Sequence, residues 1–393
     1  MIELPLASST WDDEELEAMQ NVISSGNFTM GRIVSEFEEA FAKFFGSKFA
    51  VMVNSGSSAN LLMVAAERYV SDSKMAEGSE IIVPAVSWST TYFPVHQLGY
   101  KLNFVDIDPL TLNMNVDLVE KAINSNTSAI LAVNLLGNPC NLTHLKQLAE
   151  KYNLKLLEDN CESMGALVGK KFSGTIGHAG TFSTFFSHHI CTMEGGVVVT
   201  DDENLYHTMK SLRAHGWTRD LPPANSVHNK SGSEWDDLFR FVLPGYNLRP
   251  LEIEAAIGLI QLKKLGNFVE KRRENAAYFL DKVKDTPGIR IQTEFEKSSW
   301  FGFSIVLEGH LEGHRSKLLS VLADAGIQTR PIVAGNFTKN PVMKHLNHAP
   351  LENFPAADWV HDNGFFVGNH HYEISDPIEN LTRILRAYSK ENF

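Results

Sequence analysis

The sequence predicts an α/β protein built around a mostly parallel β-sheet, with a smaller α/β domain at its C-terminal end. From Glu80 to about Asp202, short apolar runs alternate with helical stretches such as NLTHLKQLAEKYN. Apolar strands joined by helical crossovers are typical of a parallel sheet that is covered on both faces. The length of 393 residues exceeds that of one average domain and suits a large domain plus a smaller one.

The elements are expected in the following order. A leading helix is predicted in TWDDEELEAMQNVI, because capping residues come first and Leu16, Met19, Val22 and Ile23 share one helical face. The sheet is predicted in six apolar runs: EIIVPA, KLNFVDID, AILAVNLLG, LKLLEDNC, GTFSTFF and GGVVVTDD.

Residues 250–285 read as long helical material that leads into the C-terminal domain. The stretch around Leu265 to Phe268 is where we expect the helix to bend. We therefore predict a boundary near residue 270, which gives a large domain over 1–270 and a small one over 271–393.

Composition and charge argue against several classes of protein. The net charge of −12 opposes the attraction on which nucleic-acid binding depends, so nucleic acid is not an expected partner. The N-terminus lacks the basic and apolar regions of a signal peptide, and no apolar run approaches a membrane span, so we expect a cytoplasmic protein. Cys140, Cys161 and Cys191 lie far apart without CxxC spacing, which argues against disulfides and a four-cysteine iron–sulfur cluster.

A first candidate motif is NSGSSAN (54–60), which lies between the strand-like FAVMV and the helix-like LLMVAAERYV. Gly56 lets the backbone approach a ligand, and the hydroxyls of Ser57 and Ser58 together with free amides at the helix start can hold a phosphate. The alternative is an ordinary N-capped turn.

A second motif is LLEDNCESMGA, which places Asp159 at the carboxyl end of an apolar strand, where α/β sheets bind ligands. A carboxylate there can pair with a protonated ring nitrogen, as a pyridoxal cofactor requires. The alternative is that Asp159 caps a helix.

The third motif is GTFSTFFSHHICTMEGGVVVT, in which Ser183 is suited to a phosphate contact and His188 and His189 are expected at a strand end. Two histidines suggest metal ligands, but neighbours in a strand point to opposite sides and no Cys/His set completes a site, so no metal is expected. A purely structural pair remains the other alternative.

Taken together, NSGSSAN, EIIVPAVSWST, LLEDNCESMGA, SHHICTMEGG and GYNLRPLE resemble the sugar aminotransferase family of fold-type-I pyridoxal-phosphate (PLP) enzymes, from about residue 5 to residue 375. This resemblance implies the aspartate aminotransferase-like fold. Family members carry a lysine five residues after the phosphate-binding serine, and the same count from Ser183 reaches His188. The family's Gly-Glu-Gly-Gly turn is here Met193-Glu194-Gly195-Gly196.

The resemblance assigns further roles residue by residue. Ser57 and Ser183 would hold the cofactor phosphate, and Asp159 the pyridine nitrogen. Trp88 would stack on the ring, and Glu162 would lie near its phenolic oxygen. Asn247 would reach the phosphate in the other subunit, because this family shares its active sites across a homodimer.

Histidine in place of lysine resembles the sugar 3-dehydratase branch of the family. A CDP-sugar member of that branch also has histidine but needs four cysteines for its cluster, whereas this chain has three. Imidazole cannot form the imine that lysine makes with PLP, but its reference pKa of about 6.5 suits a base. The branch implies that L-glutamate loads the cofactor as pyridoxamine phosphate. His188 would then act as base and acid while the C3 hydroxyl leaves a nucleotide-linked 4-keto-6-deoxy sugar.

A further likeness within the branch is carried by SSTWDD, VPAVSWSTTY, SHHICTMEGG, RAHGWTR, FVLPGYNLRP and SSWFGFS. It implies GDP-4-keto-6-deoxymannose as the substrate and the colitose part of O-antigen lipopolysaccharide biosynthesis as the setting. Candidate cations for its anionic groups are Arg219, Arg249 and Arg330, since a guanidinium suits carboxylate and diphosphate. His215 and Trp217 are placed to line the sugar site, although packing explains both equally well. Two rival functions stay open: a nucleotide-sugar aminotransferase and a non-catalytic cofactor-binding regulator.

Overall fold

Seven strands form the central sheet of the computed structural model, which describes residues 3–70, 73 and 75–393. Their order across the sheet is β1-β9-β8-β5-β4-β2-β3. The strands are β1 (Phe49–Val53), β2 (Glu80–Pro84), β3 (Lys101–Val105), β4 (Thr127–Val133), β5 (Lys155–Asp159), β8 (Ala179–Ser183) and β9 (Gly196–Thr200). Neighbouring strands from β3 to β8 are parallel, whereas β9 is antiparallel to both β8 and β1. The predicted α/β class with a mostly parallel sheet is confirmed.

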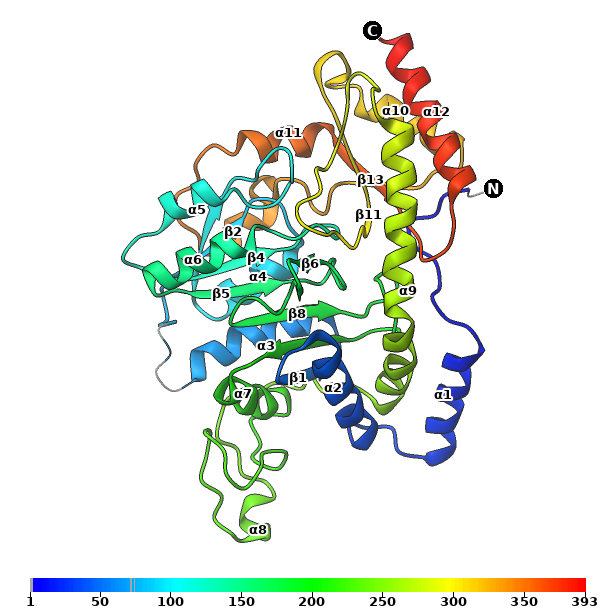
Figure 1. Cartoon of the computed structure of the whole chain (residues 1–393). Helices are drawn as coiled ribbons and strands as arrows, with labels where there is room; N and C mark the ends of the chain where they lie inside the picture. The colour runs from blue at the N-terminus through cyan, green and yellow to red at the C-terminus, as the bar shows by residue number, and fades with distance from the viewer. Residues whose placement is uncertain (1–2, 71–72, 74) are drawn as a thin grey trace.

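Helices cover both faces of this sheet (Figure 1). One face carries α3 (Gly56–Tyr69), α4 (Ser89–Gln97) and α7 (Glu203–Arg213), and the other carries α2 (Arg32–Phe45), α5 (Val116–Ala122), α6 (Leu142–Tyr152) and part of α9 (Glu252–Val283). Strand β1 shows why both faces are apolar: Val51 and Val53 enter the core with α3, while Ala50 and Met52 enter the core with α2 and α9.

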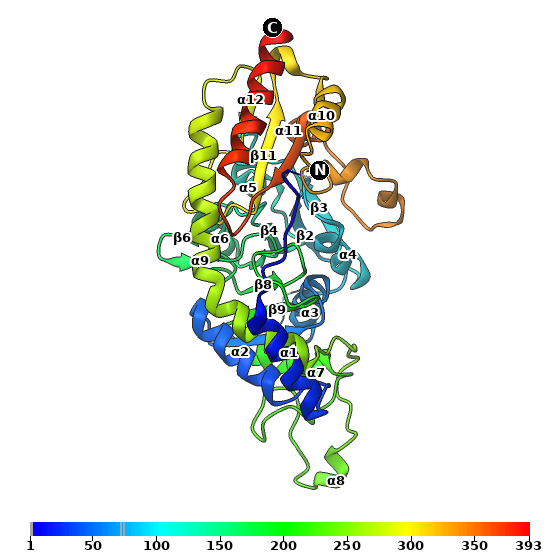
Figure 2. The same cartoon turned by 90° about the vertical axis from the view of Figure 1, so that its right-hand side faces the viewer.

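A second, smaller sheet follows α9 in the sequence. Its antiparallel strands run in the order β10 (Ile289–Ile291), β11 (Gly302–Leu307), β13 (Gly364–Gly368) and β12 (Thr329–Arg330). The core beside it includes residues of α10 (Arg315–Asp324) and α12 (Ser375–Glu391), together with Phe279 and Val283 from the end of α9. Helix α9 thus runs along both sheets (Figure 2).

Helix α9 passes through residues 265–268 without interruption, so the bend predicted there does not break the helix. The boundary near residue 270 lies inside this continuous helix and stays a prediction. At the other end of the chain, Leu4 pairs with Ile327 and packs in the core of the small sheet.

The leading helix is α1 (Asp13–Ser25), and Asp12 and Glu15 form its capping box. The leading helix forms as predicted, but only part of its apolar face is buried: Val22 is buried, whereas Leu16 and Ile23 are exposed. The buried side chain beside Val22 is that of Glu15, because Lys264 and Gln261 of α9 bind its carboxylate at 2.8 Å.

The remaining elements are short. They are β6 (Leu167–Val168), β7 (Lys171–Phe172), α8 (Glu234–Asp237), α11 (Pro355–Asn363) and the 3₁₀ turns η1 (Gly309–Leu311), η2 (Phe337–Lys339) and η3 (Pro341–His345). The segment that carries α8 projects from the body of the protein (Figure 1). Among the helices described here, none has the length and apolar character that crossing a bilayer requires.

A buried polar cluster lies at the amino edge of β5. Glu67 of α3 is fully buried, and its carboxylate lies 3.2 Å from His178 Nε2 and 3.9 Å from Lys155 Nζ. His178 also contacts Lys155, at 2.9 Å, and Asp202, at 3.7 Å. Burial raises the pKa of Glu67 to about 7, with Lys155 opposing the rise and Asp202 adding to it.

This cluster predicts that Glu67→Gln changes how stability depends on pH. The pKa of Glu67 is raised in the folded state to about 7 from an ordinary 4.5, so its stabilising contribution is complete below the ordinary value and is lost as pH rises through the folded value. The unfolding free energy of the variant, relative to that of the wild type, should therefore increase by about 2 to 3 kcal/mol as pH rises from about 5 to about 8. Urea denaturation at several pH values measures this gain. Glu17→Gln, at an exposed carboxylate of α1, is the control, and parallel pH curves for wild type and Glu67→Gln would contradict the prediction.

Candidate active site

The predicted phosphate-binding residues meet at the carboxyl edge of the parallel strands. Gly56 begins α3 directly after β1, and Ser183 ends β8. A Cβ atom on Gly56 would lie 2.6 Å from Ser183 Cβ, so glycine is what allows the two segments to approach. Ser57 is exposed and Ser58 half-buried beside them. The arrangement is a small concave turn with hydroxyls at its rim.

The turn is also capped, as the alternative prediction held. The Ser55 hydroxyl accepts the Ser58 N–H at 3.1 Å and donates to Ser58 Oγ at 3.0 Å. Capping and anion binding are compatible here, because a helix leaves several N–H groups of its first turn without intrahelical partners.

Asp159 is buried at the end of β5 and is held by several donors. Asn60 Nδ2 and Thr91 Oγ1 donate to its Oδ2 at 2.8 and 2.7 Å, and the Cys161 N–H donates to its Oδ1 at 3.2 Å. Asn60 is fixed in turn, since Thr181 donates to its Oδ1 at 2.6 Å. Residues 160–166 contain turns and no helix, so the alternative that Asp159 caps a helix is wrong.

His188 does not lie at a strand end, contrary to the sequence prediction. Strand β8 ends at Ser183, and both histidines lie in the irregular segment that follows. They differ in environment nonetheless. His189 is fully buried, with Nε2 3.1 Å from Ser299 O, whereas His188 is half-buried.

The His188 ring packs against Phe301 at a centroid distance of 5.3 Å. Its Nδ1 is buried without a hydrogen-bond partner in the described part of the chain. Burial, and secondly the charge of Arg272, lower the pKa of His188 to about 4. The imidazole is therefore neutral near pH 7 and free to accept a proton.

The turn after His188 carries a strained residue. Met193 has φ 72°, a left-handed conformation that favours glycine, and Gly195 has φ 151°. Methionine thus stands at the first position of this turn in a conformation that glycine adopts more readily.

Trp88 and Glu162 flank the Asp159 region. Trp88 precedes α4, and 57% of its surface is exposed, which leaves the indole free to stack on a planar ligand. Burial raises the pKa of Glu162 to about 7, although the Leu136 N–H donates to its Oε2 at 3.1 Å and favours the ionised form. A carboxyl group with this pKa can share a proton with a phenolic oxygen.

The other predicted residues form a second group around Trp217. The Arg219 guanidinium lies 4.2 Å from the centre of the Trp217 ring and that of Arg249 lies 5.8 Å from it, while the His215 ring centroid is 4.9 Å away. Arg249 Nε also donates to the exposed Asn247 Oδ1 at 3.0 Å. Arg330 is apart from both groups, exposed on β12 of the small sheet.

Several supporting residues escaped the sequence prediction. Asn60 and Thr91 hold Asp159, and Phe301 packs on both histidines. Asn60 lies in the NSGSSAN motif and Thr91 in VPAVSWSTTY. Their polar side chains among apolar neighbours were the signal from which these supporting residues could have been predicted. Phe301 comes from a distant part of the chain, and only the tertiary structure reveals its contact.

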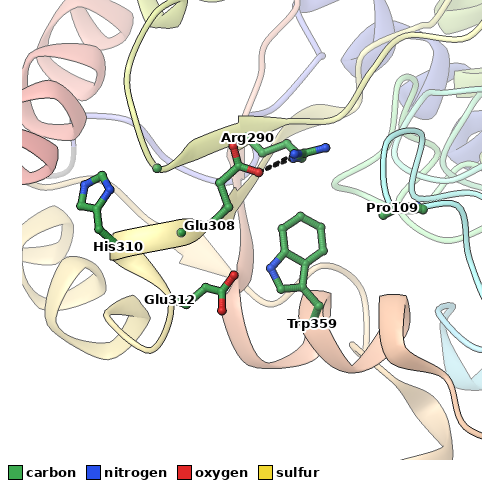
Figure 3. A pocket seen from close by; sticks show the side chains of 8 residues that line it. Pro109, Arg290, Glu308, His310, Glu312 and Trp359 are labelled. Atoms are coloured by element: carbon green, nitrogen blue, oxygen red, sulfur yellow. Dashed lines mark hydrogen bonds and ion pairs between the residues drawn. The ribbon is translucent and has the colours of Figure 1, made fainter. Parts of the chain in front are cut away.

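Other features lie outside this site. A cavity of about 580 Å³ is lined by Arg290, Glu308, His310, Glu312 and Trp359, together with Pro109, Gly288 and Gly309, and contains none of the predicted residues (Figure 3). In the described ranges, no group of three or more His, Cys, Asp or Glu side chains is suited to hold a metal ion. Cys140 and Cys191 are buried and Cys161 is half-buried, all as free thiols.

The residues at the sheet edge fit a PLP molecule. The Gly56 turn offers hydroxyls and the N–H groups of a helix start for a phosphate, Asp159 offers an acceptor for a pyridinium N–H, and Trp88 offers an exposed ring. No amine occupies the lysine position, where His188 stands.

Comparison with known proteins gives the family. The model of the DegT/DnrJ/EryC1/StrS aminotransferase family matches residues 9–385. The chain belongs to this family. Within the DegT/DnrJ/EryC1/StrS family, the chain is 52% identical over 388 residues to GDP-4-keto-6-deoxy-D-mannose 3-dehydratase of Escherichia coli O55:H7, covering 98% of this chain and 100% of that protein.

Two solved structures of such relatives share the fold of this family member, each at 52% identity. The E. coli GDP-4-keto-6-deoxy-D-mannose-3-dehydratase with bound hydrated PLP gives a TM-score of 0.96 over 98% of this chain and 100% of that one. GDP-4-keto-6-deoxymannose-3-dehydratase with a trapped PLP-glutamate geminal diamine gives 0.95 over 97% and 100%. The predicted family and aminotransferase fold are confirmed.

The contact between Gly56 and Ser183 predicts that Gly56→Ala weakens cofactor binding. The new methyl group would overpack the turn at a cost of about 1 to 3 kcal/mol. To the extent that this cost falls on the bound state, PLP affinity should drop by about 5- to 150-fold. Absorbance titration with PLP measures the affinity. Gly266→Ala is the control, because a Cβ there meets nothing within 4 Å. Equal affinities for the two variants would contradict the assigned cradle.

Proposed function

We propose that this chain is a PLP- and L-glutamate-dependent 3-dehydratase that removes the C3 hydroxyl of GDP-4-keto-6-deoxymannose and yields the 4-keto-3,6-dideoxy sugar. The observation that carries the proposal is His188, a neutral and accessible imidazole at the position where an aminotransferase of this family has its lysine. The 52% identity to a 3-dehydratase over nearly the whole chain supports the same reaction and substrate.

The cofactor is held without a covalent bond. Ser57, Ser58 and Ser183 hold its phosphate at the start of α3, Asp159 holds the pyridine nitrogen, and Trp88 stacks on the ring. When bound, PLP supplies an aldehyde that takes up the amino group of L-glutamate and a ring that withdraws electrons. Asp159 keeps this ring protonated, and Asn60 and Thr91 keep the Asp159 carboxylate aimed.

His188 moves the proton in the dehydration. The imidazole is neutral before reaction, so it takes up a proton as a base, and as an imidazolium it then donates to the departing C3 hydroxyl, which leaves as water. Because an imidazole forms no lasting covalent bond to the cofactor, the product amine is released and hydrolysed to ammonia. Glu162 follows Asp159 shortly after the end of β5 and exchanges a proton with the phenolic oxygen of the cofactor.

Arginines bind the anionic parts of the substrates. Arg219 and Arg249 lie together at Trp217, where their guanidinium groups suit a diphosphate. Arg330, on β12, is the candidate for the remaining carboxylate or phosphate contact, and His215 lines the sugar.

The enzyme acts as a homodimer with shared active sites, in the cytoplasm, which supplies its glutamate and nucleotide sugar. Support for the dimer comes from the projecting segment around α8, where Trp235, Phe239 and Phe241 are 83, 65 and 56% exposed. Large apolar side chains gathered on one exposed segment are typical of a protein contact. The exposed Asn247 is the residue assigned to the phosphate of the partner subunit.

The rival functions receive less support. An aminotransferase needs an amine at the cofactor, but Lys170 and Lys171 lie exposed in the β6–β7 hairpin. A non-catalytic regulator has no need for a neutral base beside an intact cofactor cradle.

A product assay tests the function. The purified protein is given PLP, L-glutamate and a panel of nucleotide-linked 4-keto-6-deoxy sugars, and is scored for ammonia release and for loss of the C3 oxygen. We expect both with GDP-4-keto-6-deoxymannose. His188→Asn should bind the cofactor but lose dehydration by about two to four orders of magnitude, the usual cost of losing a general base. An amino sugar formed without ammonia would identify an aminotransferase instead.

Lysine variants test the position of the base. Borohydride followed by mass spectrometry should find no pyridoxyl adduct in the wild type and an adduct at residue 188 in His188→Lys. His189→Lys is the matched control, because that side chain is buried toward Ser299. An adduct at 189 but not at 188 would move the assignment to His189.

Asp159→Asn should leave the fold intact and lower dehydration about a hundredfold or more, because the ring nitrogen loses its anion. Thr91→Val, which removes one donor but keeps the carboxylate, should cost about tenfold or less. Stopped-flow absorbance and the product assay measure both variants. Near wild-type turnover by Asp159→Asn with an unchanged cofactor spectrum would remove Asp159 from the site.

A further inference from the structure

Arg272 in the middle of α9 is a buried cation without an anion. Its side chain is 5% exposed, and no carboxylate in the described part of the chain lies within 4 Å of it. One terminal nitrogen donates to two backbone carbonyl groups, Phe301 O at 3.0 Å and Asn369 O at 2.6 Å. Its Nε is buried without a partner. A buried charge compensated only by carbonyl dipoles costs stability that an apolar side chain would not cost.

The groups around Arg272 connect it to the candidate base. It holds the carbonyl of Phe301, whose ring packs on His188 at 5.3 Å and on His189 at 5.7 Å. On its other side it holds the carbonyl of Asn369, the residue before His370. The segment Ser298–Gly302, part of the SSWFGFS motif, therefore lies between α9 and the histidines.

The charge of Arg272 acts on the pKa values of four imidazoles. Burial first, and the Arg272 charge second, lower the pKa of His188, His370 and His371 to about 4 and that of His189 well below its ordinary value. Arg273 and the neighbouring His188 add to the effect on His189. In the described part of the chain no acidic group offsets Arg272 at His188, and the contribution that raises the pKa of this imidazole comes from the backbone of Phe185.

We infer that Arg272 is a positioning residue for His188: its guanidinium holds the carbonyl of Phe301, whose ring packs on the imidazole, and it places an uncompensated positive charge near the histidine segment. This inference rests on the proposed function, in which His188 is the base. This positioning role accounts for a buried positive charge that packing alone does not require.

The next residue of α9 provides a matched control. Arg273 holds the same segment, since its Nε donates to Ser298 O at 2.9 Å and a terminal nitrogen donates to Gly165 O at 3.0 Å. Unlike Arg272 it has a carboxylate neighbour, Glu270 at 3.6 Å, and it does not act on the pKa of His188. A purely structural role of the α9 contacts would make the two arginines equivalent.

The test measures the protonation of His188 without turnover. The purified enzyme is treated with diethyl pyrocarbonate, which modifies neutral imidazole, and the modification rate of His188 is followed against pH by peptide mass spectrometry. In the wild type the rate should stay high until pH falls below about 5. In Arg272→Met the midpoint should move up by about one pH unit, whereas Arg272→Lys and Arg273→Met should keep the wild-type midpoint.

Three results would overturn the inference: a wild-type midpoint near the ordinary value of about 6.5, an unchanged midpoint in Arg272→Met, or an equal shift in Arg273→Met. Arg272→Gln replaces Arg272→Met if the latter does not fold. Because modification needs no substrate, these outcomes are independent of the product assay. A chain that fails to dehydrate any sugar but shows the Arg272 shift would overturn the proposed function and leave the electrostatic role of Arg272 standing.

Discussion

The site depends on one close backbone approach, which joins the start of α3, the end of β8 and the start of β9. Gly56 lies against Ser183, and a side chain on Gly196 would collide with the Ser55 carbonyl. This approach is possible because β9 runs between β1 and β8 in the opposite direction, so that it begins where they end. The phosphate-binding turn and the segment that leads to His188 therefore begin next to each other. A residue larger than glycine at position 56 or 196 would push them apart.

The segment that carries His188 is closed at its base by two backbone hydrogen bonds: Thr184 N–H to Gly195 O at 3.0 Å and Thr192 N–H to Thr184 O at 2.9 Å. It is then anchored from outside. Trp11 Nε1 donates to Cys191 O at 2.9 Å, and the Cys191 N–H donates to Gln261 Oε1 at 3.0 Å. Because hydrogen bonds fix this irregular segment both at its base and from outside, it can hold the His188 imidazole in place although it is neither strand nor helix.

Much of the fold and the first half of the site could be predicted from the sequence, because both depend on local patterns. Apolar runs indicated the strands, and strand ends carrying Gly, Ser and Asp indicated the ligand-binding edge. The rest depends on partners far away in sequence. Leu16 and Ile23 are exposed because Lys264 and Gln261 attract Glu15 to the interface instead. Met193 adopts a glycine-like φ of 72° that no propensity favours. The different environments of His188 and His189 arise from Ser299 and Phe301, not from strand alternation.

The ionisable groups at the carboxyl edge of the sheet have different surroundings, and these surroundings determine what each group can do chemically. Asp159 receives three donated hydrogen bonds, which suit an ionised acceptor. Glu162, three residues on, receives one from Leu136, and burial raises its pKa to about 7. His188 Nδ1 has no hydrogen-bond partner among the described residues, and burial together with the Arg272 charge lowers the pKa of this imidazole to about 4. The edge thus offers a carboxyl group that accepts three hydrogen bonds, a second carboxyl group whose raised pKa lets it share a proton near pH 7, and a neutral imidazole, and these differences in environment assign one role to each.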